Sequence, residues 1–216
     1  MSTSWLNHRV RNMSSTKKSQ DTEKQILNAA KKVFQKKGMD GARMQEIADE
    51  AGINKAMLHY YFRSKQVLFE TVFRNAFDLL APQLNKILND DSTIEEKVKN
   101  FTHNYISFIA KHPYLPNFII QEMNRNPKFF EEIQPNIELP TLDKFNAQVD
   151  LEVEQGILKP IDGKQLLINI ISLNIFPFLA SPLIKEFLRI DNKEFKELLE
   201  ERKKAVSSFI INSIKK

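Results

Sequence analysis

Cysteine is absent from this chain of 216 residues, and glycine is scarce, with 5 residues. Without thiols the chain can form no disulfide, no iron–sulfur cluster, no Cys-ligated zinc site and no thiol nucleophile, and their absence fits a reducing compartment. Few glycines, no sustained alternation of polar and apolar residues, and abundant Lys, Glu, Leu and Ile argue against β-strands. Because 42% of the residues are hydrophobic, we exclude a disordered chain. With strands disfavoured, we expect an all-α fold.

No hydrophobic run is long enough to predict a signal peptide or a membrane span. The N-terminal segment is basic and polar and lacks the apolar core of a secretory signal. The most apolar stretch, residues 166–180, is interrupted by Asn169, Asn174 and Pro177 and is shorter than the roughly 20 residues that a span needs. We therefore expect a cytoplasmic protein with no membrane contact, in which this stretch is buried in a core or in an oligomer interface.

Residues that carry catalysis or bind metals are also sparse. The four histidines, at positions 8, 59, 103 and 112, fall in no HExxH pattern, and the chain has neither a GxSxG elbow nor a Gly-rich phosphate loop. No dense carboxylate pair lies near a histidine. We therefore expect no enzyme, no metal site and no cofactor.

Charge is distributed unevenly along the chain. Residues 1–74 carry 14 Lys and Arg against 7 Asp and Glu, whereas residues 75–216 carry 18 against 20. A basic end on a neutral to acidic body is typical of a protein that binds a polyanion. A solvated Lys-rich face would have the same composition, so charge alone leaves both interpretations open.

Caps, glycines and prolines divide the chain into helices. Residues 1–18 have almost no periodic apolar positions, and we expect them to form a flexible basic arm. The first helix is predicted to run from the capping box of Thr22 and Gln25 to Gly38. Ser64 is predicted to cap a long helix. The other predicted helices span residues 43–51, 54–62, 92–111, 116–125, 127–134, 140–155 and 192–214, with one more opening at Asp162.

The segment from Met44 to Phe62, MQEIADEAGINKAMLHYYF, has the spacing of a helix-turn-helix. Two short helices that cross steeply need a small residue at the crossing and a residue that tolerates positive φ in the turn, and Ala48 and Gly52 meet these needs. Their facing sides carry Ile47, Ala51, Ile53, Leu58 and Tyr61. The second helix would lie in the major groove of DNA and present to phosphates and base edges the side chains of Lys55, Ala56, His59 and Tyr60. An ordinary three-helix packing motif is the alternative.

This segment resembles the DNA-binding domain of TetR (tetracycline-repressor) type transcription regulators. The resemblance is carried by Ile47-Ala48, Ala51-Gly52-Ile53-Asn54, Leu58-His59-Tyr60-Tyr61-Phe62 and Lys65. Three positions depart from the family pattern, since Asn54 replaces Ser, His59 replaces Tyr, and Ala42-Arg43 replace a capping Ser or Thr. Asn54 can still cap a helix, His59 can make a phosphate contact pH-dependent because histidine titrates near neutrality, and Arg43 would supply charge in place of the missing hydroxyl.

The resemblance also implies the DNA contacts and the domain organisation. By position, Tyr61 and Lys65 would hold phosphates and Gln45 would lie close to DNA at the start of the second helix. The full set of expected DNA-binding residues is Arg43, Gln45, Asn54, Lys55, Ala56, His59, Tyr60, Tyr61 and Lys65. The expected domains are the flexible arm at 1–18, a helix-turn-helix domain at 19–66, and a larger helical domain for effector binding and dimerisation at 67–216.

A single helix-turn-helix reads few bases, so we expect a homodimer that places two recognition helices on a palindromic operator. We assign the dimer interface to residues 162–185 and 192–214, which also matches how the family pairs. Burial of the stretch 166–180 within one subunit is the alternative.

The resemblance further implies a pocket for a small effector, and the aromatic residues of the central helices suit an apolar or aromatic ligand. The candidate lining residues are Phe101, Asn104, Tyr105, Phe108, Phe118, Gln121, Glu122, Met123, Phe129 and Phe130.

The expected function is therefore that of a ligand-responsive transcription regulator, a repressor that its effector releases from double-stranded DNA. A transcription activator of the same fold and a helical protein–protein adaptor with a basic head are the alternatives. Preference for one DNA sequence over another separates a regulator from an adaptor.

Overall fold

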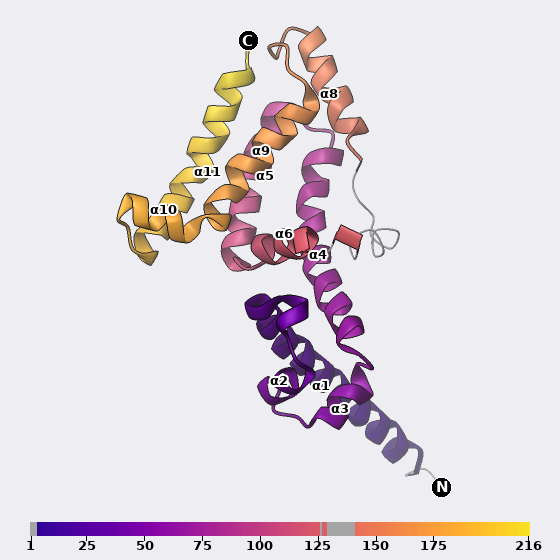
Figure 1. Ribbon diagram of the computed structural model, residues 1–216. Coiled ribbons are helices and arrows are strands. Elements are labelled where there is room, and N and C mark those ends of the chain that lie inside the picture. Colours follow the sequence, from indigo (N-terminus) through magenta and orange to yellow (C-terminus); the bar gives the residue numbers. More distant parts are fainter. Residues whose placement is uncertain (1–3, 126, 129–140) are drawn as a thin grey trace. The chain divides into compact units, whose positions relative to one another are not determined.

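Figure 1 shows the computed structural model, which describes residues 4–125, 127–128 and 141–216, with side chains from residue 19 onward. Within these ranges the chain is helical and contains no strand, apart from one isolated antiparallel bridge between Leu158 and Lys215. The expected all-α class is therefore confirmed. The helices are α1 (Ser4–Gly41), α2 (Met44–Glu50), α3 (Lys55–Tyr61), α4 (Lys65–Asn89), α5 (Ile94–Lys111), α6 (Leu115–Arg125), α8 (Asp143–Glu154), α9 (Gly163–Leu179), α10 (Ser181–Leu188) and α11 (Asn192–Ile214).

The helices form two compact units, Met1–Asn75 and Ala76–Lys216. The sequence predicted the boundary between the two domains earlier, after residue 66. The first turns of α4 belong to the N-terminal unit because Phe69 packs edge-on against Phe34 of α1, with ring centroids 5.0 Å apart and both side chains buried. The start of α4 thus completes the core of the N-terminal unit.

Helix α1 begins well before the start predicted at Thr22. It includes residues 4–18, where the sequence predicted no helix, and the flexibility expected of this segment stays a prediction. No glycine or proline precedes Gly38, and extending an existing helix avoids the cost of nucleation, so a lack of apolar periodicity does not end it. The stop predicted at Gly38 coincides with a break in α1, where this residue has a φ of 67° before the last turn to Gly41.

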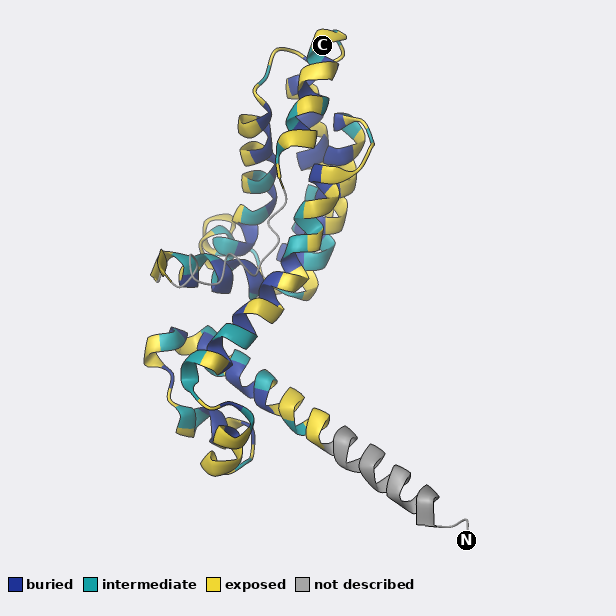
Figure 2. Ribbon diagram, turned by 90° about the vertical axis from the view of Figure 1, so that its right-hand side faces the viewer, coloured by how far each residue is buried: buried dark blue, intermediate teal, exposed yellow. Residues whose placement is uncertain are grey.

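Helix α5 lies at the centre of the C-terminal unit and packs against both α9 and α11 (Figure 1). Its apolar residues recur at a helical spacing and are buried, namely Ile94, Val98, Phe101, Tyr105, Ile106 and Ile109. Figure 2 shows buried inner faces and exposed outer faces along the helices of this unit. The helices predicted at 92–111, 116–125, 140–155 and 192–214 are confirmed with shifts of a few residues, whereas most of the helix predicted at 127–134 lies outside the described residues.

A buried carboxylate joins α8 to the first turn of α5. Glu152 is 2% exposed, and its Oε1 accepts hydrogen bonds from the backbone N–H of Ile94 at 3.0 Å and from Nε2 of Gln148 at 2.7 Å. The first N–H groups of a helix have no partner within that helix. Glu152 satisfies one of them, and its negative charge is favoured at a helix N-terminus.

Two residues that interrupt the apolar stretch of α9 are accommodated inside the protein. Pro177 has no N–H, so it leaves the carbonyl of Leu173 without its helical donor. Nη2 of Arg202 in α11 donates to this oxygen at 2.8 Å. Asn174 is fully buried and donates Nδ2 to a carbonyl of its own helix at 2.7 Å and to Oγ1 of Thr102 at 3.3 Å.

Helix α10 follows α9 after a bend of 75° and was not predicted as a separate helix. In the described part of the chain, no helix alone combines the length and apolar composition needed to cross a bilayer. The bent pair α9 and α10 reaches that length and composition only when both helices are counted together.

Replacing Glu152 with Ala should lower the free energy of unfolding by about 2–3 kcal/mol, because the buried N–H of Ile94 loses its partner. Urea unfolding followed by circular dichroism measures the change. The matched control is Glu154→Ala on the same helix, where the side chain is exposed, and it should cost less than about 0.5 kcal/mol. Equal losses for the two variants would contradict the role of Glu152 at the start of α5.

Candidate nucleic-acid interface

The start of α2 is held by two charged side chains rather than by a capping hydroxyl. Arg43 precedes the helix in an extended conformation, and its N–H donates to the Glu46 carboxylate at 3.4 Å. Lys37 of α1 donates to the same carboxylate at 2.6 Å, and this hydrogen bond holds the pKa of Glu46 below its ordinary value. The Arg43 guanidinium itself forms no cap and stays exposed.

The turn between α2 and α3 is tight and well connected. The N–H of Gly52 donates to the carbonyl of Asp49 at 3.1 Å, and the N–H of Ile53 donates to the carbonyl of Ala48 at 3.0 Å. Gly52 has a φ of 65°, a conformation that other residues rarely adopt. Gln25 of α1 donates Nε2 to the carbonyl of Ala51 at 2.6 Å, so α1 fixes the end of α2.

Helix α3 buries one side and exposes the other. Asn54 caps its N-terminus by accepting a hydrogen bond from the N–H of Met57 at 2.7 Å, as predicted. Leu58 is 0% exposed and anchors the helix to the unit, whereas Tyr60 is 82% exposed. The exposed side of α3 therefore carries the side chains expected from the sequence, Lys55, Ala56, His59 and Tyr60.

The structure separates the nine predicted DNA-binding residues into two groups. Seven are exposed, namely Arg43, Gln45, Asn54, Lys55, Ala56, His59 and Tyr60. Tyr61 and Lys65 are half-buried, and both contact protein atoms. The Tyr61 hydroxyl donates to Oγ of Ser19 at 3.4 Å, and the ammonium of Lys65 donates to the carbonyls of Asp40 and Ala42 at 3.3 and 3.1 Å. Lys65 thus ties α4 to the segment before α2, and its phosphate contact stays a prediction.

Cations near α3 differ in whether a carboxylate already neutralises them. Lys32 and Lys37 form ion pairs with Glu50 and Glu46 at 2.7 and 2.6 Å. Among the described residues, no ion pair is formed by the exposed cations Arg43, Lys55 and Arg63. Arg63 is not among the residues predicted from the sequence, and its backbone carbonyl lies 3.4 Å from Nδ1 of His59. Its position directly after the recognition helix was the signal that could have identified it.

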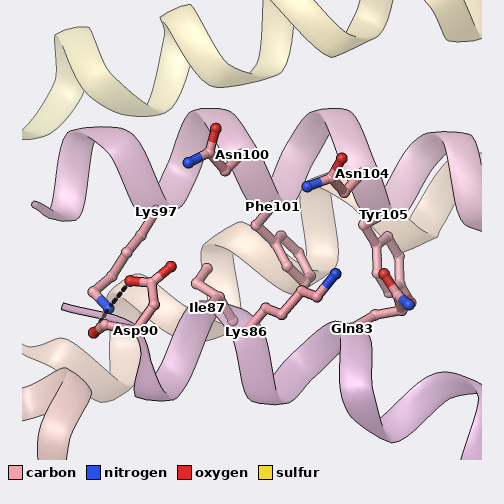
Figure 3. A pocket seen from close by; sticks show the side chains of 9 residues that line it. All are labelled: Gln83, Lys86, Ile87, Asp90, Lys97, Asn100, Phe101, Asn104 and Tyr105. Carbon is pink, nitrogen blue, oxygen red and sulfur yellow. Dashed lines mark hydrogen bonds and ion pairs between the residues drawn. The ribbon is translucent and has the colours of Figure 1, made fainter. Parts of the chain in front are cut away.

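Only part of the predicted effector set comes together in the C-terminal unit. Phe101, Asn104 and Tyr105 line a pocket of about 220 Å³ between α4 and α5 (Figure 3). The other described members, Phe108, Phe118, Gln121, Glu122 and Met123, do not line this pocket, and their contact with an effector stays a prediction. The last four of these belong to α6, which packs against α9, while the Phe108 ring packs 4.8 Å from that of His112. Phe129 and Phe130 lie outside the described residues.

Apart from Asn104, the polar part of the pocket lining was not predicted. It comes largely from the second half of α4 and the first half of α5, and includes Gln83, Lys86, Asp90 and Lys97. Polar residues at helical spacing usually indicate a solvated face, so the sequence had no signal that these side chains share a pocket.

A helix-turn-helix with an exposed second helix and unpaired cations beside it defines a DNA-binding protein. Known proteins identify its family. The family model described as "Bacterial regulatory proteins, tetR family" matches residues 26–72, from within α1 to the first turns of α4.

Relatives match well beyond this motif. The HTH-type transcriptional regulator RutR of Escherichia coli is 30% identical over 150 residues, which cover 68% of this chain and 69% of RutR. The protein named "Probable HTH-type transcriptional regulator YttP" of Bacillus subtilis is 24% identical, over 80% of this chain and 84% of YttP. A crystal structure of a TetR-family transcriptional regulator from Haemophilus influenzae has the same fold, with a TM-score of 0.57 at 18% identity, and covers 92% of this chain and 98% of that one. The chain belongs to the TetR family and is a helix-turn-helix transcriptional regulator.

Replacing Lys65 with Met should lower the free energy of unfolding by about 1 kcal/mol, because two backbone carbonyls lose a charged donor. Thermal unfolding monitored by circular dichroism measures the loss. Lys55→Met is the matched control, since the Lys55 side chain is exposed at the start of α3, and it should leave the stability unchanged. If Lys65→Met were as stable as the unmodified protein, the structural role assigned to this lysine would be wrong.

Proposed function

We propose that this regulator is a homodimeric repressor that binds a two-fold symmetric operator through α3 and leaves it when a small effector binds the C-terminal unit. The observation that carries the proposal is the outward face of α3, on which Lys55, His59 and Tyr60 are exposed. A cation without a carboxylate partner can pair with phosphate and release condensed counterions. Exposed aromatic and imidazole groups on the same helix suit base edges and thymine methyl groups.

The candidate DNA-binding residues form two groups, those that would position the domain on the phosphates and those that would contact the bases. Arg43, Lys55 and Arg63 would pair with phosphates and set the register of the domain on the duplex. Ala56 permits close approach of the helix, while His59 and Tyr60 would lie against base edges in the major groove. Gln45, Tyr61 and Lys65 would then lie at the margin of the contact.

Exposed apolar side chains support dimerisation through the assigned segments 162–185 and 192–214. On α9, Ile168 and Phe176 are 55% and 54% exposed, and on α11, Phe209 is 65% exposed. Helix α10 buries no residue and exposes Leu183, Phe187 and Leu188. Large apolar side chains on consecutive helices are typical of a surface that a partner covers. A second copy is the partner that would supply a second recognition helix, about 34–36 Å from the first or a multiple of that distance.

Repression follows from occupancy, because a bound dimer blocks other proteins from the same DNA. Release requires the effector to bind the DNA-free arrangement more tightly than the DNA-bound one. The gain in effector affinity then equals the loss in operator affinity.

Selection from a random duplex pool should yield a two-fold symmetric sequence that the protein binds about a thousandfold more tightly than a scrambled control.

Tyr60→Ala should weaken binding to the selected duplex by about 1–3 kcal/mol and relax base preference, because a base contact is lost. Lys55→Ala should weaken binding to all sequences and reduce the slope of log affinity against log salt by about 1. Fluorescence anisotropy at several salt concentrations measures both effects.

The control for these variants is Lys111→Ala, an exposed lysine at the end of α5, which should leave DNA binding unchanged. Equal affinity for the selected and scrambled duplexes would favour a basic adaptor over a regulator. A reporter gene placed behind the selected operator decides the sign of regulation, and expression that rises when the protein is supplied would favour an activator.

Phe176→Asp should convert the dimer to a monomer, because a carboxylate would be buried at the apolar interface without a partner. Size-exclusion chromatography with light scattering measures the mass, and circular dichroism checks that the variant stays folded. The control is Ile157→Asp, since Ile157 is 46% exposed but lies outside the assigned segments. A dimeric Phe176→Asp variant would place the interface elsewhere.

A further inference from the structure

The pocket between α4 and α5 is small and has an unusual balance of charges. Its volume of about 220 Å³ is below the range of roughly 300–1,000 Å³ that is usual for drug-sized ligands, so its ligand has the size of about one ring. Figure 3 shows Lys86 on α4, and Asp90 directly after the end of α4, facing side chains that extend from α5. Two cations, Lys86 and Lys97, and one anion, Asp90, line the pocket.

Asp90 neutralises only one of the two cations. The Lys97 side chain is 1% exposed, and its ammonium donates to the backbone carbonyl of Asp90 at 2.6 Å and to its carboxylate (Figure 3). Partial burial opposes ionisation of Asp90, but hydrogen bonds from Lys97 and Ser92 outweigh it and hold its pKa below the ordinary value. The Asp90 carboxylate therefore balances the charge of the Lys97 ammonium.

Lys86 is the cation that remains. Its ammonium forms no ion pair and no hydrogen bond within the described part of the chain. Figure 3 shows its side chain extending along α4 toward the rings of Phe101 and Tyr105. The pocket thus carries a net charge of one positive unit, which a single anionic group would balance.

An aromatic wall and an unused donor lie next to this cation. The rings of Phe101 and Tyr105 are stacked, with centroids 4.8 Å apart and an angle of 25° between their planes. Tyr105 is 1% exposed, and its hydroxyl forms no hydrogen bond to any described residue. Burial raises the pKa of Tyr105, so the phenol keeps its proton and can donate.

We propose that this pocket binds a small aromatic monocarboxylate. The carboxylate pairs with Lys86 and accepts a hydrogen bond from the Tyr105 hydroxyl, while the ring of the ligand lies against Phe101. A purely apolar ligand would remove the exposed Lys86 ammonium from water without giving it a partner, and it would leave the buried Tyr105 hydroxyl without an acceptor, which is unfavourable. A cation would be repelled, and a dianion would leave an uncompensated negative charge. The binding site stands independently, and only its part in releasing DNA rests on the proposed function.

Isothermal titration calorimetry of the full chain tests the site with benzoate, with neutral benzamide and with acetate, which has no ring. Benzoate should bind at least about tenfold more tightly than benzamide, because only the carboxylate forms the charged pair with Lys86. Acetate should bind more weakly than benzoate, because it cannot contact the aromatic wall. Equal affinities for benzoate and benzamide would overturn the anionic site, and equal affinities for benzoate and acetate would overturn its aromatic part.

Substitutions locate the binding. Lys86→Met should abolish the preference for benzoate over benzamide and leave the weak binding of benzamide unchanged. Because Lys86 is exposed, we expect this variant to fold normally. Tyr105→Phe keeps the ring and should weaken benzoate binding a few-fold. Lys111→Met, on the same helix as Tyr105 but outside the pocket, should leave the benzoate affinity unchanged. Benzoate binding that is unaffected by Lys86→Met would overturn the assignment.

Operator binding separates this inference from the proposed function. A protein that binds its operator but not benzoate would overturn the carboxylate site and leave DNA recognition intact. Benzoate binding that depends on Lys86 but leaves operator affinity unchanged would keep the site and overturn its role in release.

Discussion

The left-handed turn at Gly52 is the constraint on which the DNA-binding surface depends. It ends α2 and redirects the chain so that α3 can bury Leu58 and still expose Tyr60. The hydrogen bond from Gln25 to the carbonyl of Ala51 fixes this turn to α1. Because two short helices bury little surface by themselves, their orientation depends on these few contacts and on the cap at Asn54.

The C-terminal unit depends on polar groups that satisfy one another inside an apolar framework. Glu152 completes the hydrogen bonding at the start of α5, and Arg202 supplies the donor that Pro177 takes away from α9. The buried Lys97 side chain pairs with the exposed Asp90 at one end of the α4–α5 pocket. These contacts hold α5 firmly, so a ligand that meets Lys86 and Tyr105 acts on a helix that also packs against α9 and α11. Under the proposed function, this packing would connect the effector pocket to the predicted dimer interface.

Local signals in the sequence predicted the helix-turn-helix well, because caps and turns depend on neighbouring residues. Asn54, Gly52 and Ser64 act as expected. The same signals failed for residues 4–18, where the absence of apolar periodicity suggested no helix and the chain instead continues α1. They also gave no sign that the Lys65 ammonium donates to the carbonyls of Asp40 and Ala42, which are distant in sequence.

The sequence by itself determined the fold class, the position of the helix-turn-helix and the family, because each rests on residues within a few turns of one another. Only the tertiary structure decided which cations are already paired, which aromatic residues share a pocket, and which chemistry that pocket favours. Lys86 and Tyr105 lie on different helices, and although the sequence indicated Tyr105 as a lining residue, it did not indicate Lys86 beside it. Their meeting depends on how α4 packs against α5, and such packing is set by the summed contacts of the whole unit rather than by local propensity.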